Sequence, residues 1–154
     1  MNKMISNLTI SKIQVIWQTG KNFYNNYKKH ENESIKVLPF IEDMASAYAA
    51  SDLVISRSGA ISCSELTVCG KPSILIPFPN AAADHQTKNA NTLVEHGAAF
   101  MFNEKDMHYE KVTITIQNLL IDDNRLNKMS KASYQLGKPN ATDTIVNEAM
   151  GLIK

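Results

Sequence analysis

Small and polar residues gather where one apolar run of the sequence gives way to a helical pattern. The apolar run is residues 53–55, and the sequence SRSGA at residues 56–60 follows it directly. Small residues at a strand-to-helix turn allow a ligand to approach backbone N–H groups, and the helix N-terminus adds partial positive charge, which suits phosphate. The same residues also suit a structural role, with Ser58 as an N-cap and Gly59 as a turn residue. The spacing leaves both interpretations open.

One carboxylate lies further along the same predicted helix. Glu65 comes three residues after Ser62 and seven after Ser58, so these side chains are expected on one helical face. A carboxylate in that place can accept hydrogen bonds from two vicinal hydroxyls, as a ribose offers. A solvated surface glutamate is the simpler alternative.

A second polar stretch, PFPNAAADHQ at residues 77–86, follows the next apolar run. Its prolines stiffen a loop that leaves a predicted buried strand. Asp84, His85 and Gln86 then bring donors and acceptors to the start of a helix, with Asp84 as its expected N-cap. His85 could act as a base, but a solvated or sugar-contacting histidine is the favoured interpretation.

Two other predicted strands also end in residues able to contact a ligand. Phe40 and Ile41 follow strand 34–38, where the Ile41 backbone could bond to the edge of a planar base while the Phe40 ring covers its face. Thr19 and Gly20 follow strand 12–17 and could face a phosphate. Core packing and a simple turn are the respective alternatives.

The elements needed to position these residues alternate along the chain. Helices are expected over residues 1–11, 22–32, 42–50, 60–69 and 84–95, and three more open at Asp106, Asp122 and Thr142. Apolar runs predict strands at residues 12–17, 34–38, 53–55, 73–77 and 98–102. This alternation predicts a Rossmann-like, doubly wound parallel sheet in one α/β domain spanning residues 1–154. Ligands bind such sheets beyond the carboxyl ends of the strands, where both polar stretches fall.

One standard part of such a domain is not found in the sequence. No GxGxxG motif occurs, and the chain starts at what would be the helix after the first, central strand. We therefore expect a domain that lacks its first strand and Gly-rich turn. Strands 12–17 and 53–55 would each lose a neighbour, which predicts open backbone edges, marginal stability and self-association.

Composition narrows the function classes. The 154 residues carry a net charge of +1 without a Lys/Arg run, which gives no support for nucleic-acid binding. No apolar stretch reaches the ~18–20 residues of a membrane span, and the N-terminus lacks the apolar core of a secretory signal. Cys63 and Cys69 are interpreted as reduced, small, buried residues of a cytoplasmic protein, and no cluster of metal ligands occurs.

Taken together, four groups of residues resemble a known family. They are residues 17–20 (WQTG), 39–44 (PFIEDM), 56–60 with Glu65, and 70–90, which contains GKP, IPFP, HQ and NA. At these spacings they are similar to the C-terminal, donor-binding domain of the UDP-N-acetylglucosamine–lipid I N-acetylglucosaminyltransferases of glycosyltransferase family 28. The resemblance covers nearly the whole chain. It implies the GT-B architecture, in which two Rossmann-like domains work without a metal or other cofactor, and it leaves the family's N-terminal domain unmatched.

The resemblance also implies a role for each candidate residue in binding UDP-N-acetylglucosamine (UDP-GlcNAc). Around the uracil and ribose these residues are Phe40, Ile41 (through its backbone), Met44 and Glu65. Near the nucleotide and diphosphate they are Thr19, Ser58, Gly59, Ala60, Ile61 and Ser62. At the hydroxyls of the sugar they are His85 and Gln86, although several family members have Gln in place of His85. The resemblance places no catalytic residue within this chain.

For function, the resemblance implies the donor-binding part of an inverting transfer that converts lipid I to lipid II in peptidoglycan synthesis. The lipid I site, the catalytic base and most membrane contact would belong to the missing N-terminal domain, so this part would be inactive alone. The expected location is peripheral, on the cytoplasmic face of the bacterial inner membrane. A stand-alone nucleotide-sugar-binding subunit with a separate acceptor-binding partner is the alternative, and UDP-GlcNAc epimerisation is less favoured.

Overall fold

The structure, a computed structural model, describes Met4, Leu8 and residues 13–153 of the chain. By its contacts the chain divides into two compact units, residues 1–53 with 105–126 (unit 1) and residues 54–104 with 127–154 (unit 2). The helix expected over residues 1–11 lies outside the described residues, apart from Met4 and Leu8, which are both buried.

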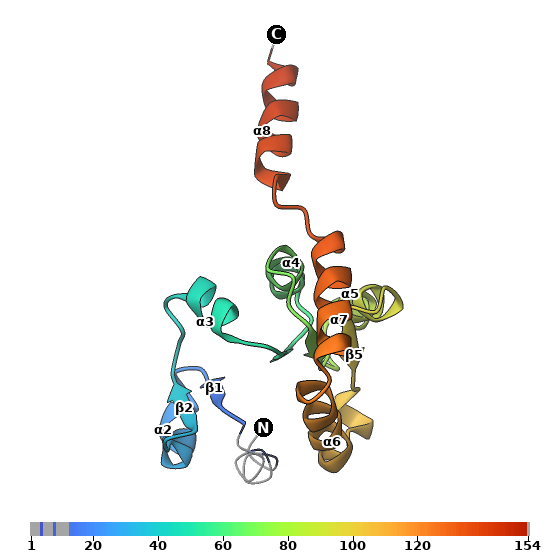
Figure 1. Cartoon of the computed structure of the whole chain (residues 1–154). Helices are drawn as coiled ribbons and strands as arrows, with labels where there is room; N and C mark the ends of the chain where they lie inside the picture. The colour runs from blue at the N-terminus through green and yellow to red at the C-terminus, as the bar shows by residue number, and fades with distance from the viewer. Residues whose placement is uncertain (1–3, 5–7, 9–12, 154) are drawn as a thin grey trace. The chain divides into compact units, whose positions relative to one another are not determined.

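Unit 1 contains a two-stranded parallel sheet, in which β1 (Val15–Gln18) pairs with β2 (Ile35–Leu38) and Val15 lies opposite Ile35 (Figure 1). The connecting segment forms only two short turns, α2 (Tyr24–Tyr27) and η1 (Lys28–His30). The single helix expected over residues 22–32 is therefore wrong. Neither turn has a side-chain cap, and the asparagines of α2 favour turns over helix.

Two further helices belong to unit 1. α3 (Met44–Ala50) follows β2 and is capped by Asp43, whose carboxylate accepts a hydrogen bond from Ser46 N at 3.0 Å. α6 (Tyr109–Leu120) begins later than expected, because a separate 3-10 turn, η3 (Glu104–Asp106), precedes it. The buried face of α6 carries Val112, Ile116 and Leu119.

Unit 2 contains a three-stranded parallel sheet in the order β3-β4-β5. β3 (Val54–Ser56), β4 (Ser73–Leu75) and β5 (Ala99–Met101) are joined by α4 (Ala60–Val68) and α5 (His85–Glu95), which gives two consecutive βαβ units. β4 is central and all its residues are buried, as expected for an apolar run without alternation. The loops that leave the carboxyl ends of β3 and β4 therefore meet at one edge of this sheet.

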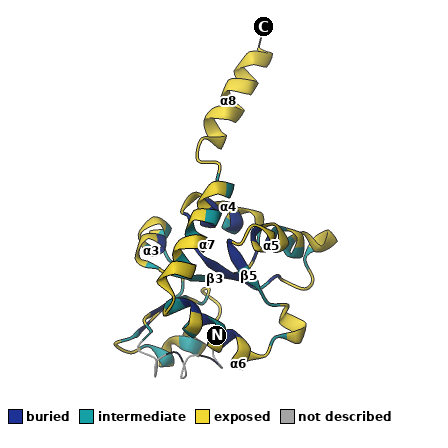
Figure 2. Ribbon diagram, turned by 45° about the vertical axis from the view of Figure 1, so that its right-hand side comes forward, coloured by how far each residue is buried: buried dark blue, intermediate teal, exposed yellow. Residues whose placement is uncertain are grey.

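Two C-terminal helices follow, close to their expected starts. α7 (Asp123–Leu136) is tied to α4 by Ser133, whose hydroxyl donates to Leu66 O at 3.2 Å. α8 (Ala141–Leu152) has no buried residue, and Figures 1 and 2 show it projecting away from the rest of unit 2.

The expected α/β fold with parallel strands is confirmed, and the described strands form two sheets. Within the described residues, β1 pairs only with β2 and β3 only with β4, so each keeps one edge without a strand partner. This agrees with the expectation of open edges at both strands. No helix in the described ranges has the length and apolar character needed to cross a membrane.

The expectation of two buried cysteines is correct for Cys63 and wrong for Cys69. Cys63 lies on the inner face of α4, and burial raises the pKa of its thiol. Cys69 is the C-cap of α4 and is exposed, because six residues turn a helix well past its buried face.

Candidate functional site

The candidate residues fall into two groups, one in each unit. The unit 1 group follows strands β1 and β2, and the unit 2 group lies on α4, on the turn before it and at the start of α5. That one ligand contacts both groups stays a prediction. The unit 1 group is Thr19, Phe40, Ile41 and Met44, and the unit 2 group is Ser58, Gly59, Ala60, Ile61, Ser62, Glu65, His85 and Gln86.

In unit 1 the candidate residues lie beyond the carboxyl ends of two adjacent parallel strands. Thr19 is fixed there, because its backbone N–H and its hydroxyl both donate to Leu38 O, at 2.9 and 3.2 Å. Phe40 is 58% exposed, so its ring is accessible to a ligand, while Ile41 and Met44 are half-buried. The parallel topology thus brings the four predicted residues to one edge of the sheet.

The backbone N–H of Ile41, predicted to contact a base, already has a partner. It donates a hydrogen bond to Gln18 Oε1 at 2.8 Å. Sequence reasoning did not select Gln18, although it ends β1 directly before Thr19 and β1 pairs with the strand that precedes Ile41. A base that bonds to this N–H must first displace the Gln18 amide.

In unit 2, Ser58 fastens the turn between β3 and α4. Its side chain is fully buried, its hydroxyl donates to Gln86 O at 2.8 Å, and its carbonyl accepts from Asn89 Nδ2 at 3.0 Å. The N-cap of α4 is Gly59, so the alternative role of Ser58 as that cap is wrong. These two bonds hold the N-terminal turns of α4 and α5 together. Sequence reasoning missed Asn89, whose position one turn after Gln86 on α5 was the available signal.

The N-terminus of α4 is open to a ligand. The N–H groups of residues 60–62 belong to the first turn of the helix, where no intrahelical acceptor exists, and the cap residue Gly59 supplies no side-chain bond. A Cβ built on Gly59 meets no atom within 4 Å, so a chemical group can approach the backbone there. These donors and the helix dipole favour an anion such as phosphate.

Glu65 lies on the exposed face of α4 together with Ile61, whereas Cys63 and Leu66 are buried. Its carboxylate follows the open N-terminus by more than one helical turn, about 7 Å along the axis. The expectation that Ser58 shares this face is wrong, because Ser58 precedes the helix and bonds to α5 instead. An anion site followed by an exposed carboxylate has the order needed for a phosphate and then a ribose.

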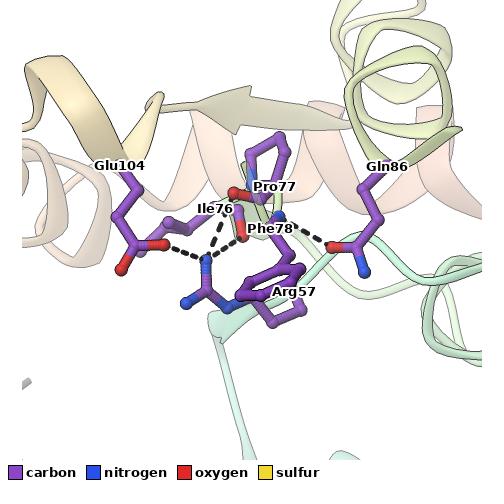
Figure 3. A network of polar contacts seen from close by, with 6 residues as sticks. All are labelled: Arg57, Ile76, Pro77, Phe78, Gln86 and Glu104. Carbon is purple, nitrogen blue, oxygen red and sulfur yellow. Dashed lines mark hydrogen bonds and ion pairs between the residues drawn. The ribbon is translucent and has the colours of Figure 1, made fainter. Parts of the chain in front are cut away.

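His85 and Gln86 begin α5 in different environments. His85 is exposed. Gln86 is half-buried, and its Oε1 accepts a hydrogen bond from the backbone N–H of Phe78 at 2.9 Å (Figure 3). With the carbonyl oxygen facing Phe78, the amide nitrogen of Gln86 points away and remains a donor.

The turn before α5 has an unusual backbone conformation. Ala83 and Asp84 have φ angles of 46° and 55°, in the left-handed region that residues with a Cβ seldom adopt. Asp84 is the N-cap residue of α5, as expected, but its side chain makes no capping bond, because its Oδ1 accepts from the Thr87 hydroxyl at 2.6 Å instead of from a backbone N–H. Strained backbone of this kind is concentrated at functional sites.

One ion pair borders the unit 2 group. Arg57 Nη1 lies 2.7 Å from Glu104 Oε2, and each side chain is a little under half exposed. The hydrogen bond from Arg57 lowers the pKa of the Glu104 carboxyl below its usual range. Among the residues that the structure describes, no group of three or more His, Cys, Asp or Glu side chains could hold a metal ion.

Comparison with curated proteins finds relatives along the whole chain. A protein from Cytophaga hutchinsonii named UDP-N-acetylglucosamine--N-acetylmuramyl-(pentapeptide) pyrophosphoryl-undecaprenol N-acetylglucosamine transferase is 42% identical over 153 residues. A protein of the same name from Flavobacterium psychrophilum is 43% identical over 153 residues. Each match covers 99% of this chain and 41% of the relative, so the chain spans about two fifths of their length.

Solved structures and family models agree with these relatives. MurG from Acinetobacter baumannii matches with a TM-score of 0.81 and 32% identity, over 90% of this chain and 43% of that chain. The kitacinnamycin glycosyltransferase, at 17% identity and a TM-score of 0.67 over 87% of this chain and 34% of that chain, supports the fold alone. Residues 1–145 match the model of the glycosyltransferase family 28 C-terminal domain. The chain therefore belongs to the family of glycosyltransferase family 28 C-terminal domains, with the Rossmann-like fold of the C-terminal half of GT-B enzymes.

Proposed function

We propose that this chain binds UDP-GlcNAc as the donor-binding part of an N-acetylglucosaminyltransferase that converts lipid I to lipid II. The observation that carries the proposal is the open N-terminus of α4, where the Gly59 backbone is accessible and the exposed Glu65 follows on the same helix. Family membership and the names of the relatives support the same donor and reaction.

The diphosphate, the ribose and the sugar of the donor each have a proposed contact in unit 2. The diphosphate accepts hydrogen bonds from the N–H groups of residues 60–62, and the Glu65 carboxylate accepts from the ribose hydroxyls. The Gln86 amide nitrogen donates to a hydroxyl oxygen of the sugar, and His85 lies beside it in the sequence at the start of α5.

The unit 1 group serves the other end of the donor in this proposal. Phe40 and Met44 surround the uracil, and the Ile41 backbone bonds to its edge once Gln18 is displaced. Thr19, at the neighbouring strand end, lies near the phosphates.

The proposed reaction is an inverting transfer. A hydroxyl of lipid I attacks the anomeric carbon of GlcNAc, the bond to the diphosphate breaks, and UDP leaves. Positive partial charge at helix N-termini stabilises the negative charge that develops on the leaving diphosphate. We place the acceptor site and the base outside the 154 residues, which span about two fifths of the relatives. Because lipid I is a membrane lipid, the proposed location is peripheral, on the cytoplasmic face.

Calorimetric titration of the chain with UDP-GlcNAc, UDP-glucose and UDP tests donor binding. We expect saturable binding that prefers UDP-GlcNAc and is weakened about tenfold by Glu65→Gln, since a hydrogen bond to a charged group is worth more than about 1.4 kcal/mol. Glu110→Gln, a change of another exposed glutamate on α6, is the control and should leave binding unchanged. Absence of saturable binding by the folded chain would overturn the proposal.

The need for further protein is a separate part of the proposal. We expect the chain alone to bind donor without transferring GlcNAc to a lipid I analogue. Transfer by the purified chain alone would contradict this part and leave donor binding intact. A stand-alone subunit is the alternative, and transfer restored by adding a separate acceptor-binding protein would favour it.

A further inference from the structure

Arg57 joins the turn after β3 to the loop after β4. Its Nη1 donates to the backbone carbonyls of Ile76 and Pro77, both at 3.2 Å, and to Glu104 Oε2 at 2.7 Å (Figure 3). The guanidinium carbon also lies 5.5 Å from the centre of the Phe78 ring, within the range of a cation–π contact. One arginine therefore holds three consecutive residues of the loop.

The same loop sets the orientation of Gln86. Phe78, the third residue held by Arg57, donates its backbone N–H to Gln86 Oε1 at 2.9 Å. An N–H donor can face only the oxygen of the amide, so this bond decides which end of the Gln86 side chain points outward. The backbone of Gln86 is fixed separately, through its carbonyl and the Ser58 hydroxyl.

We propose that Arg57 is a positioning residue, which holds the Ile76–Phe78 loop so that the Gln86 amide presents its nitrogen to the sugar of the donor. Arg57 itself does not contact the donor in this arrangement. Glu104 keeps the guanidinium in place, because its carboxylate accepts a hydrogen bond from Nη1 on the side that faces away from the two carbonyls. The inference rests on the proposed function, since it assigns Gln86 to the sugar.

A positioning role for Arg57 predicts a selective loss of ligand affinity, which a general loss of folding would not cause. If Arg57 acts through Gln86, its replacement weakens binding of the sugar part of UDP-GlcNAc and spares UDP. We expect Arg57→Met to reduce affinity for UDP-GlcNAc about tenfold, the effect of losing one hydrogen bond, while affinity for UDP changes less than about twofold. Arg57→Lys, which keeps a cation with several N–H donors, should restore part of the difference. Arg125→Met on α7 is the matched control.

A double substitution tests the path through Gln86. In a Gln86→Ala background, Arg57→Met should cause no further loss of UDP-GlcNAc affinity, because two residues that act as one unit are not additive. Equal weakening of UDP and UDP-GlcNAc by Arg57→Met, or additive losses in the double variant, would overturn the proposal.

A measurement without ligand separates this inference from the proposed function. Hydrogen exchange of the Phe78 amide reports its bond to Gln86 directly. We expect exchange to accelerate about tenfold or more in Arg57→Met and to stay unchanged in Arg125→Met. Unchanged exchange in Arg57→Met overturns the positioning role even if donor binds. Failure of the wild-type chain to bind UDP or UDP-GlcNAc overturns the proposed function and the role of Gln86 toward the sugar, while faster exchange in Arg57→Met would still show that Arg57 holds the loop.

Discussion

The hydroxyl of Ser58 donates a hydrogen bond to the backbone carbonyl of Gln86 at 2.8 Å, across 28 residues of sequence. This bond joins the turn that opens α4 to the first turn of α5, so it couples the proposed diphosphate contacts to the proposed sugar contact. We expect Ser58→Ala to lower the free energy of unfolding by about 1 kcal/mol, because a buried hydrogen bond is lost. Urea unfolding measures this, and the exposed Ser64→Ala on α4 is the control. Equal stability of the two variants would show that the bond contributes nothing.

Gly137 lies where α7 ends against α4, and the structure leaves no room there for a side chain. A Cβ on Gly137 would lie 2.8 Å from Thr67 O and 3.1 Å from Val68 Cα, which are backbone atoms that cannot rotate away. We therefore expect Gly137→Ala to lower the free energy of unfolding by about 1–3 kcal/mol.

Gly151 provides the matched control for that substitution. A Cβ on Gly151 meets no atom within 4 Å, and the residue lies inside α8. Gly151→Ala should be neutral or stabilise the helix by up to about 1 kcal/mol, because alanine favours helix over glycine. Urea unfolding measures the free energy of unfolding of both variants. A destabilisation by Gly151→Ala as large as that by Gly137→Ala would contradict the close packing of Gly137 against α4 as the cause.

The ion pair of Arg57 and Glu104 predicts that the stability of the folded chain depends on pH. The hydrogen bond from Arg57 lowers the folded-state pKa of Glu104 below its ordinary 4.5. A carboxyl whose pKa is lowered by folding stabilises the folded chain at any pH above its unfolded-state pKa. This contribution is lost as the pH falls through the lowered, folded-state pKa. Because both side chains are substantially exposed, we expect the loss to be below about 1 kcal/mol. Denaturant midpoints of wild type and Glu104→Gln should differ at neutral pH and converge in acid; a constant difference would contradict the assignment.

The βαβ unit at the centre of the chain could be predicted from local sequence. Residues 53–55 and 73–77 are apolar runs without alternation, bounded by Gly and Pro, and such runs specify buried parallel strands. The structure has β3 and β4 there, with α4 between them. β4 is buried as expected, whereas β3 is only half-buried, because it lies at an edge of the described three-stranded sheet. Residues 22–32 could not be predicted in the same way. Phe23, Tyr24 and Tyr27 have the spacing of one helical face, but the segment lacks side-chain caps and does not form a single helix.

The side-chain contacts of the candidate site depend on long-range packing that local patterns do not contain. Gln18 and Ile41 are 23 residues apart, and Arg57 and Glu104 are 47 apart. Sequence patterns indicated which residue types lie at the strand ends, and they correctly placed Glu65 on the helix that follows the turn after β3, which is α4. They could not show which side chain bonds to which backbone group, and this is why the roles of Gln18 and Arg57 became visible only in the structure.

The hydrogen bond between Gln18 and Ile41 competes with the proposed contact of Ile41 with the uracil base. Gln18 Oε1 accepts from the Ile41 N–H at 2.8 Å, so a uracil that bonds to Ile41 must replace this contact. Replacing one exposed hydrogen bond by another yields little free energy, and removal of the competitor leaves the N–H available. We expect Gln18→Ala to increase affinity for UDP by up to about fivefold, which corresponds to about 1 kcal/mol.

The exposed Gln14→Ala, just before β1, is the control for that change and should leave UDP affinity unaltered. Calorimetric titration with UDP measures both variants. A loss of affinity in Gln18→Ala would mean that Gln18 holds the strand-end loop in its binding conformation and that the contact with Ile41 supports the base site instead of competing for it. An unchanged affinity would mean that the base does not bond to the Ile41 N–H, and Phe40, whose ring is more than half exposed, would then be the residue of unit 1 to test for contact with the base.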